Sequence, residues 1–306
     1  MKKFIALLLT VVLTATIAVG GTVAYLQDDA RNDNTMTMGK VDISQWEYQR
    51  VQNADGTYPT ETIDGKTSYK LEGFEQDKPL LPAIIPNGGT VGGVTWNYDA
   101  IPVRMSQVNS YGGASVFNTP NAVDKFVVVE NTGKTDAYVR TLIAFELGSK
   151  NATEVMSNLI ACEIRADKDA STGNQPWTYG DQGTIQIDGK NYFYYEFIYT
   201  GASGTSGTDT VDGWRHKDGV LPAGKTTYPN LCQVYMASKA TNEDVAALDG
   251  NNNGKYDIIV LSQAVQADGW TAAGGKYVAE FALDTAFGDA NAVNVAEWFA
   301  PQTTTP

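Results

Sequence analysis

The chain has 306 residues, of which 19% are charged, and its formal net charge is −13 at pH 7. This acidity argues against a nucleic-acid partner, because nucleic-acid binding depends on clustered Lys and Arg that neutralise phosphates, and the sequence has no such cluster. A chain of this length can bury the core of one large β-domain or of two modest ones, so size alone does not fix the number of domains.

The N-terminus has the pattern of a secretory signal peptide. The basic start "MKK" precedes an apolar run over residues 4–19, and the small residues of "GGTVA" follow. We predict a signal peptide over residues 1–25, cut after Ala24 or one residue later after Tyr25, so that the exported chain begins at Tyr25 or at Leu26. An uncleaved membrane anchor is the competing interpretation, but the Gly pair favours cleavage. The acidic exported chain would be soluble and would meet the membrane only through this peptide.

Alternation of apolar and polar residues dominates the rest of the chain and predicts strands. "DKFVVVENTG" leads into "DAYVRTLIAFELG", which we interpret as two strands about a Gly turn. "TIQIDGKNYFYYEFIYT" places Asp188 and Gly189 between two β-rich runs, a strong signal for a tight hairpin. Further strands are expected at 39–51, 231–236, 256–266 and 277–283.

Few helices are expected, and all are short. Asn151 can cap "ATEVMSNL", Thr241 and Asp244 fit a capping box before "DVAAL", and "ANAVNVAEWF" fits a last helix. Together these patterns predict an all-β antiparallel sandwich with small helical inserts, formed as one domain over residues 39–306. Residues 52–119 and 201–213 are rich in Gly, Pro, Asn, Ser or Thr and are expected to be long loops.

The junction over residues 20–43 has a further pattern. "GGTVA" is followed by the acidic pair Asp28 and Asp29, then by Asn34 and Thr35, and then by "GKVDI" at residues 39–43. This junction resembles the N-terminus of the TasA/camelysin family of exported fibre proteins. "VVVENTGKTDAYVRTLIAFE", "VLPAGKTTYPNL" and "DIIVLSQAVQADGW" are also similar to that family's strands, the first of them to its first core hairpin. The resemblance covers the two ends and the centre but neither long loop.

The resemblance implies a jelly-roll sandwich that a dedicated signal peptidase cuts and that assembles into biofilm-matrix filaments outside the cell. Its partner would be a second copy, joined head to tail, and the need for an accessory anchor protein stays open. Residues 26–38 are the candidate donor strand: a released segment can add to a sheet edge of a neighbour through backbone hydrogen bonds. The donor residues that we single out are Leu26, Thr35, Met36, Thr37 and Met38. An ordinary frayed N-terminus is the alternative.

Catalytic signatures are missing from the sequence. The single histidine, His216, lies in the polar run "GWRHKDG", and there is no HExxH zinc motif and no G-x-S-x-G elbow. A serine triad also needs a histidine beside its nucleophile. A glycosidase-type carboxylate pair stays open in so acidic a chain, but no pair stands out. We therefore predict a protein that is not an enzyme and that needs no cofactor.

"LDGNNNGKYDI" resembles part of a calcium loop. Asp249, Asn251 and Asn253 take the first, third and fifth places, and Asp257 could add an oxygen at the ninth. The twelfth place is Val260 and not the bidentate Glu that a full EF-hand requires. The alternative, which we favour, is an Asn/Gly turn without any ion.

The alternative function is that of a secreted carbohydrate- or calcium-binding adhesion module that does not polymerise. Aromatic residues are the reason for considering carbohydrate binding. Trp177, Tyr179, Trp214 and the run 192–199 could offer flat faces to sugar rings. Alternation along the run opposes this, because one of its two faces, or both, would belong to the core.

The two cysteines, Cys162 and Cys232, lie in apolar, strand-like stretches. Export from the reducing cytoplasm permits a disulfide between them. Two buried thiols are an equally good interpretation, because the sequence does not show that the two strands are neighbours.

Overall fold

The computed structural model describes part of the chain, and the following account is limited to that part. The described ranges are 27–31, 36–38, 41–63, 66–83, 90–91, 94–95, 98–99, 102–105, 110–113, 116–117, 121–164, 177–201, 219–237, 239–250, 253–271 and 276–300. The predicted signal peptide with its cleavage residues Ala24, Tyr25 and Leu26 lies outside these ranges, as do His216 and nearly all of the loop 201–213. None of the helices within the ranges combines the length and apolar character needed to cross a membrane.

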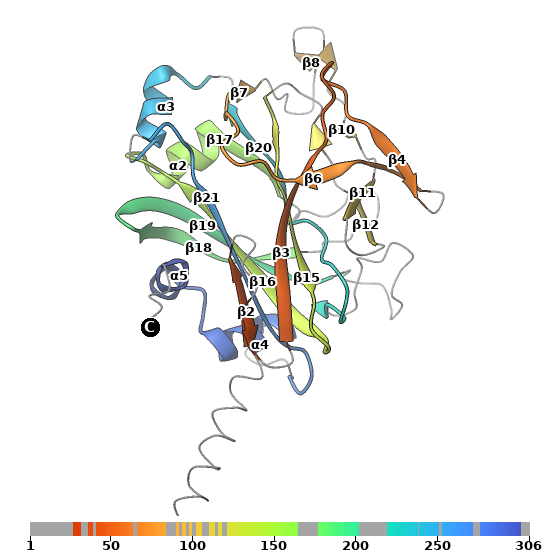
Figure 1. Ribbon diagram of the computed structural model, residues 1–306. Coiled ribbons are helices and arrows are strands. Elements are labelled where there is room, and N and C mark those ends of the chain that lie inside the picture. Colours follow the sequence, from red (N-terminus) through yellow and green to blue (C-terminus); the bar gives the residue numbers. More distant parts are fainter. Residues whose placement is uncertain are drawn as a thin grey trace, which may run out of the picture.

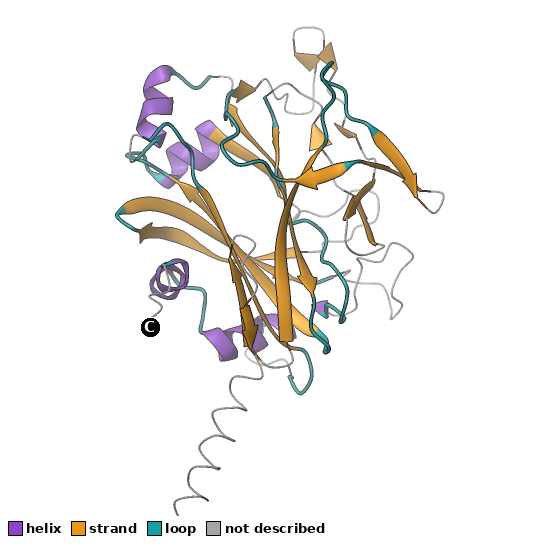
Figure 2. Ribbon diagram, in the orientation of Figure 1, coloured by secondary structure: helices purple, strands orange, loops and turns teal. Residues whose placement is uncertain are grey.

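Strands dominate the described chain, and the helices are short (Figure 2). The largest sheet has five strands in the order β1-β21-β16-β19-β18, and every neighbouring pair is antiparallel. Its strands are β1 (Gln27–Arg31), β21 (Ile258–Gln266), β16 (Ala137–Glu146), β19 (Lys190–Tyr199) and β18 (Trp177–Ile187). The mostly antiparallel β prediction is therefore confirmed, and none of the described sheets closes into a barrel.

Two smaller sheets lie across the main core from the five-stranded sheet. One has the order β15-β3-β2 with β6 also on β3, and the other has the order β14-β20-β17 with β7 parallel to β20. Their strands are β2 (Met36–Met38), β3 (Val41–Arg50), β6 (Leu71–Gly73), β7 (Pro82–Ala83), β14 (Val123–Asp124), β15 (Phe126–Asn131), β17 (Ile160–Ile164) and β20 (Leu231–Ala237).

The main core consists of apolar side chains from all three of these sheets. Ile43 on β3 and Val129 on β15 belong to the same buried cluster as Ile143 on β16 and Phe197 on β19. These side chains are inaccessible to water, so the burial of apolar area between the sheets is the main source of stability for this layer.

The region 52–119, predicted to be a long loop, contains short strands where the structure describes it. They form a four-stranded sheet in the order β12-β11-β5-β4 and two separate pairs, β10 with β13 and β8 with β9. Their bounds are β4 (Thr60–Ile63), β5 (Lys66–Tyr69), β8 (Thr90–Val91), β9 (Val94–Thr95), β10 (Tyr98–Asp99), β11 (Pro102–Met105), β12 (Ser110–Gly113) and β13 (Val116–Phe117). Strands of two to four residues are too short to show alternation of apolar and polar residues. The Gly and Pro content of the region therefore predicts a loop.

The predicted helix starts are confirmed. Asn151 caps α2 (Ala152–Glu154), which continues as the π-helical turn η1 (Val155–Leu159). Thr241 and Asp244 form the expected capping box of α3 (Asn242–Leu248). Asn291 caps the last helix, α5 (Ala292–Phe299), by accepting hydrogen bonds from two backbone N–H groups.

The strand predicted at 277–283 is wrong, because these residues begin the helix α4 (Val278–Phe287). The side chains that α4 buries are Ala279, Ala282 and Leu283. Their spacing of three and four is that of a helix face, and Ala at two of the positions favours a helix over a strand.

The predicted hairpin at Asp188 and Gly189 is confirmed, since both residues have positive φ, 50° and 80°, and join β18 to β19. The other pair of neighbouring strands, β15 and β16, does not form a hairpin. β15 pairs with β3, whereas β16 pairs with β19 and β21, so the Gly turn carries the chain from one sheet to another.

Helices cover the outer face of the five-stranded sheet. Phe299 and Val295 of α5 pack with Tyr194 of β19, and Leu283 of α4 packs with Ile198. Figure 1 shows α5 beside the β18–β19 hairpin and α4 near the lower end of β16, with α2 and α3 at the opposite end of the molecule. The central strands β21, β16 and β19 are therefore largely buried on both faces, whereas much of β18 is exposed.

Candidate assembly site

The N-terminal strand β1 completes one edge of the five-stranded sheet. It pairs antiparallel with β21 over five residues, from Gln27 opposite Val265 to Arg31 opposite Leu261. More than 200 residues separate the two strands in the sequence. Without β1, the outer backbone N–H and C=O groups of β21 would have no strand partner, and such an edge is a template for another strand.

The β21 residues that lie opposite β1 are all buried. They belong to different clusters: Ala264 faces the main core, whereas Leu261 and Val265 pack under the helices of the outer face. Between them lie two polar residues, Ser262 and Gln263, each with no exposed area.

The candidate donor residues Met36, Thr37 and Met38 form β2, which pairs with β3 opposite Ile43, Asp42 and Val41. Leu26 and Thr35 lie outside the described residues. The part of the segment 26–38 that covers the edge of β21 is thus residues 27–31, and not the Met/Thr alternation on which the sequence prediction concentrated. β1 and β2 belong to different sheets, although only residues 32–35 separate them.

Ser262 connects β21 to β3 on the inner face of the sheet. Its hydroxyl lies 3.0 Å from the hydroxyl of Thr141 on β16 and donates to Oε1 of Gln45 at 2.8 Å. All three side chains are buried. Hydrogen bonds of this kind offset the cost of placing polar groups in the core and fix the alignment of the two sheets.

Gln263 lies on the outer face and contacts a buried arginine. Its Oε1 accepts a 2.7 Å hydrogen bond from Nε of Arg140, whose Nη1 also contacts Glu196 at 3.2 Å and Asp284 of α4 at 3.0 Å. Arg140 has no exposed area, and Trp298 of α5 stacks 4.5 Å from its guanidinium carbon. Burial lowers the pKa of Arg140 and raises the pKa of Glu196, while the ion pair between them opposes both shifts.

Two buried amide nitrogens beside this edge have no hydrogen-bond partner among the described residues. They are Nε2 of Gln45 on the inner face and Nε2 of Gln263 on the outer face. In each case the Oε1 atom of the same amide is used, so the orientation of the group is fixed by its acceptor bond. An unsatisfied buried donor costs about 1–3 kcal/mol, which makes two of them at one sheet edge unusual.

Sequence reasoning missed these polar residues, although a signal was present. "IIVLSQAVQ" is an apolar strand interrupted by Ser262 and Gln263 at its centre, where one faces each side of the sheet. Polar residues at both faces of a strand that reads as fully buried indicate a specific polar contact.

The predicted calcium loop forms a turn with its own hydrogen bonds. The carboxylate of Asp249 accepts from the backbone N–H of Asn253 at 3.0 Å and of Gly254 at 2.7 Å, and Gly254 has a φ of 76°. Asp257 forms an ion pair with Lys190. Asn251 lies outside the described residues, and no group of three acidic, His or Cys side chains within them could hold a metal ion. These contacts are those of the Asn/Gly turn, and calcium binding stays a prediction.

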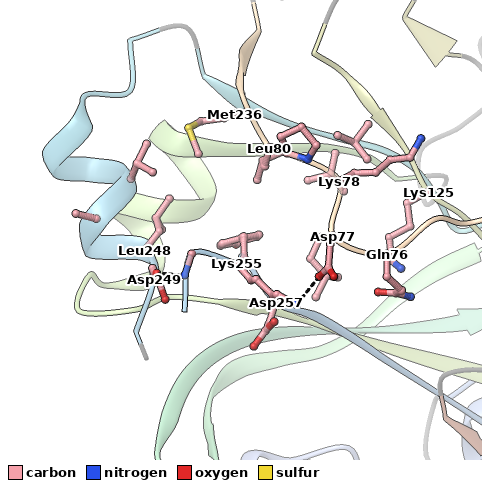
Figure 3. Close-up of a pocket in the computed structure, with 18 of the residues that line it drawn as sticks. Gln76, Asp77, Lys78, Leu80, Lys125, Met236, Leu248, Asp249, Lys255 and Asp257 are labelled. Carbon is pink, nitrogen blue, oxygen red and sulfur yellow. Dashed lines mark hydrogen bonds and ion pairs between the residues drawn. The ribbon is translucent and has the colours of Figure 1, made fainter. Parts of the chain in front are cut away.

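A cavity of about 540 Å³ lies beside this turn, between α3, β20 and residues 74–80 (Figure 3). Its floor includes Leu80, Met236 and Leu248, and its rim carries an ion pair of 2.7 Å between Lys255 and Asp77. The rim is exposed and holds charges of both signs, so it does not indicate one class of ligand.

The glutamate behind this cavity, Glu146, has no exposed area, and its carboxylate accepts from the backbone N–H groups of Gly250 and Asp257, both at 3.1 Å. Burial raises the pKa of Glu146, and these two hydrogen bonds together with Lys190 oppose that shift. Both carboxylate oxygens already accept a backbone hydrogen bond, so this group stabilises the turn.

The aromatic run 192–199 is buried on both faces. Tyr192 and Tyr194 pack with the outer cluster, whereas Phe197 and Tyr199 belong to the main core. Trp177 is also buried and donates its indole N–H to the backbone oxygen of Tyr228 at 2.8 Å. Trp214 lies outside the described residues. Tyr179 is exposed, and its ring lies 6.0 Å from the half-buried ring of Tyr195, so sugar binding at this face stays a prediction.

Cys162 and Cys232 are thiols and do not form a disulfide with each other. Cys162 packs against the main core, and Cys232 belongs to a separate cluster with Phe126 and Val128. Their strands β17 and β20 are neighbours, yet the two side chains serve different apolar clusters.

Comparisons with known proteins return no relative. No family model matches the chain. No curated protein and no solved structure matches it either. The resemblance to the TasA/camelysin family therefore rests on the stretches of sequence quoted above, which are residues 20–43 and the three strand-like segments.

Proposed function

We propose that the chain is a secreted structural protein, without catalytic activity, that polymerises into extracellular filaments by exchange of its N-terminal strand. The observation that carries the proposal is the pairing of β1 with β21. A short segment next to the predicted leader covers the edge of a sheet whose strands otherwise come from the centre and the C-terminal part of the chain.

A strand that pairs with its own chain can pair in the same way with another copy. If β1 leaves β21, the exposed edge offers the same backbone groups to β1 of a neighbour. Such an exchange is head to tail, and where the rotation between copies does not close it produces filaments. We further propose that the three sheets around the main core form a jelly-roll-like β-sandwich.

Cleavage of the predicted signal peptide would determine when this exchange can take place. An N-terminus still joined to an apolar membrane segment would be held at the membrane, whereas cleavage after Ala24 or Tyr25 would release the segment 26–38. The resemblance to the TasA/camelysin family implies that a dedicated signal peptidase makes this cut. We place assembly outside the cell for the same reason and leave a second, anchoring protein as an additional partner.

The test compares two purified chains, one starting at Leu26 and one starting at Gly39, by electron microscopy with and without calcium. We expect filaments from the longer chain and none from the shorter one, because the shorter chain has no β1 to donate. Circular dichroism of the shorter chain must show that it retains the β-sheet signal.

Filaments from both chains, or from neither, would overturn the exchange. In that event the non-polymerising carbohydrate- or calcium-binding module becomes the function to pursue. Filaments that need both β1 and calcium would add the loop at Asp249 to the assembly mechanism without replacing the exchange.

A further inference from the structure

A lysine and an aspartate at one end of the five-stranded sheet are in contact beside a buried glutamate. Lys190 is the first residue of β19, and Asp257 directly precedes β21. The Nζ atom of Lys190 forms an ion pair with Oδ2 of Asp257. Glu146 is the last residue of β16, the strand that lies between β19 and β21. Three adjacent strands therefore bring together an amine, a carboxyl group and a second, buried carboxyl group.

The strand register places all three side chains on the outer face of the sheet. Glu146 is opposite Tyr192, and Lys190 precedes Tyr192 by two residues on the same strand. The backbone N–H of Glu146 donates to the backbone oxygen of Asp257 at 3.1 Å, which continues the pairing of β16 with β21. Residues two apart on one strand share a face, and so do residues directly opposite each other. The contact between Lys190 and Asp257 is therefore set by strand pairing.

The side chain of Glu146 also fixes the position of Asp257. One of its carboxylate oxygens accepts from the backbone N–H of Asp257, and the other accepts from that of Gly250, both at 3.1 Å. Glu146 has no exposed area, so its own position is fixed by packing. Two groups held in reacting geometry in this way can have an effective concentration on the order of 10⁵–10⁸ M.

An amine and a carboxyl group held in contact can condense to an amide. Burial lowers the pKa of Lys190, but the hydrogen bond from Asp257 and the charge of Glu146 raise the pKa overall, so the resting pair is ionic. Condensation begins when one proton passes from the ammonium to the carboxylate. The neutral amine then attacks Cγ of Asp257.

The Nζ–Cγ bond forms as a Cγ–Oδ bond breaks, and the hydroxyl leaves with a second amine proton as water. One ammonium and one carboxylate thus give one amide and one water molecule. The reaction requires no oxidant, reductant or further reactant.

The surroundings of the pair favour a neutral product. The side chains of Lys190 and Asp257 are 17% and 34% exposed, and Tyr192 beside them is 2% exposed. Together with Glu146, the pair places three charged groups where water is partly excluded. An amide carries no charge, so its formation removes the cost of desolvating the ion pair.

We propose that Lys190 and Asp257 form an intramolecular isopeptide bond, with Glu146 as the residue that positions them. The bond would join β19 to β21 across the central strand β16 and would keep this end of the sheet closed. The proposal goes beyond strand exchange and does not depend on it, because the bond forms within one chain.

The test measures the intact mass of the mature chain starting at Leu26, in a denaturing solvent. In most molecules we expect a mass lower than the calculated mass by that of one water molecule. Tandem mass spectrometry of protease fragments should then find Lys190 joined to Asp257. Lys190→Arg keeps the positive charge, but a guanidinium does not lose its proton in proteins and cannot attack, so this variant should have the full calculated mass.

A second Lys–Asp pair of the chain is the matched control. Lys150 contacts Asp244 at 2.8 Å, and these side chains are 19% and 23% exposed, much as in the proposed site. The glutamate near this pair, Glu154, is exposed. We therefore expect Lys150 and Asp244 to remain unlinked in the same fragments.

The role of Glu146 is tested by Glu146→Gln, in which one of the two acceptor oxygens is replaced by a donor. We expect the linked fraction of this variant to be about ten-fold lower or less, because Asp257 is no longer held in place. Only folded protein, separated by gel filtration and checked by circular dichroism, is measured, so a loss of fold does not count as a loss of the bond. Full linkage in Glu146→Gln, or linkage of Lys150 to Asp244, would overturn the positioning role.

The full calculated mass for the unchanged chain would overturn the bond itself. A bond between other residues, or the same mass deficit in Lys190→Arg, would also overturn it. The measurement on the unchanged chain decides even if a variant does not fold. It involves no filaments, so its failure is distinct from a failure of the proposed function.

Discussion

The two outer strands of the five-stranded sheet, β1 and β18, are joined to it in different ways. β18 reaches its partner β19 through the two-residue turn at Asp188 and Gly189. β1 reaches its partner β21 from the other end of the sequence. The first edge closes a short loop, whereas the second must bring together residues more than 200 positions apart.

This difference indicates that the β1 edge of the sheet can open more easily than the β18 edge. Strand pairs joined by a tight turn re-form as soon as they separate, because the turn keeps the ends together. A terminal strand has no such connection on its free side, and it is drawn from the part of a structure that opens at the lowest free energy. β18 is also irregular near Gly180, where a bulge shifts the register between Tyr179 and Gln182, and bulges discourage the addition of another strand.

One buried network connects both edges. Arg140 on the central strand β16 contacts Gln263 towards β1 and Glu196 towards β18. The second oxygen of Glu196 accepts from the backbone N–H of Asp181 in the bulge at 2.9 Å. A Cβ atom on Gly180 would lie 2.2 Å from this carboxylate, so a larger residue there would displace the carboxylate from its present position. Substitutions can therefore be chosen that destabilise both edges together or one edge alone.

The largest expected effect is that of Arg140→Met, which affects both edges. Removing the guanidinium leaves Glu196 buried without a cation and leaves Asp284 with Lys276 as its cation, and breaking a buried pair in this way costs about 3–5 kcal/mol. Urea unfolding followed by circular dichroism measures the loss. Arg140→Lys keeps the charge and should lose less, and a loss below about 1 kcal/mol for Arg140→Met would contradict the role assigned to this residue.

A smaller effect, restricted to the β18 edge, is expected for Gly189→Val. Gly189 has a φ of 80°, and a β-branched residue there is strained by about 1–2 kcal/mol. Hydrogen exchange should become faster in β18 and β19 and stay unchanged in β21. Gly73→Ala is the matched control, because a Cβ atom there meets nothing within 4 Å and no positive φ strains it. Faster exchange in β21 would show that the edges are not independent.

The pH dependence of stability should carry a contribution from Glu196. Burial raises the pKa of this carboxyl above its ordinary value of 4.5, so the folded chain holds the proton at a higher pH than the unfolded chain does. The stabilisation by this proton is fully present below pH 4.5 and is lost as the pH rises through the folded-state pKa.

Urea midpoints measured from pH 4 to 8 test this sign. Glu196→Gln should flatten the fall in stability above pH 4.5, and Glu243→Gln, an exposed change at the start of α3, should leave the profile as it is. An unchanged profile for Glu196→Gln would mean that other groups set the pH dependence.

The smallest expected effect lies at the exposed rim of the cavity. Asp77→Ala removes an ion pair with Lys255 in which both side chains are more than half exposed, and such pairs contribute about 0–1 kcal/mol. Thermal unfolding and hydrogen exchange at β1 and β18 should match the unchanged chain. A shift at either edge would indicate that the cavity beside the turn communicates with the sheet.

Local patterns in the sequence were sufficient for much of the fold. Alternation identified β15, β16 and the later strands, and the capping residues Asn151 and Thr241 marked two helix starts correctly. The segment containing Ala279, Ala282 and Leu283 was misassigned because a short apolar run fits both periods, and packing against the sheet decides between them.

The candidate site was less predictable, because it depends on which distant strands meet. The acidic pair was noted only as part of the family resemblance, and nothing in residues 26–38 indicates β21 as their partner. Gln263 gains its buried contact with Arg140 because β21 pairs with β16, and neither stretch of sequence indicates that pairing by itself. Pairings of high sequence separation are the part of a fold that local propensity does not encode.

The antiparallel pairing of β1 with β21 also has a mechanical consequence. In a filament built by exchange, tension along the fibre would pull β1 along its own axis, parallel to the strand it pairs with. The interstrand hydrogen bonds lie across that axis, so they would be loaded together and not opened one at a time. A strand pair loaded along its axis would separate slowly, whereas the same pair would separate easily when its hydrogen bonds break one at a time from one end. The filament would therefore resist stretching, although its subunits exchange strands readily before they are stretched.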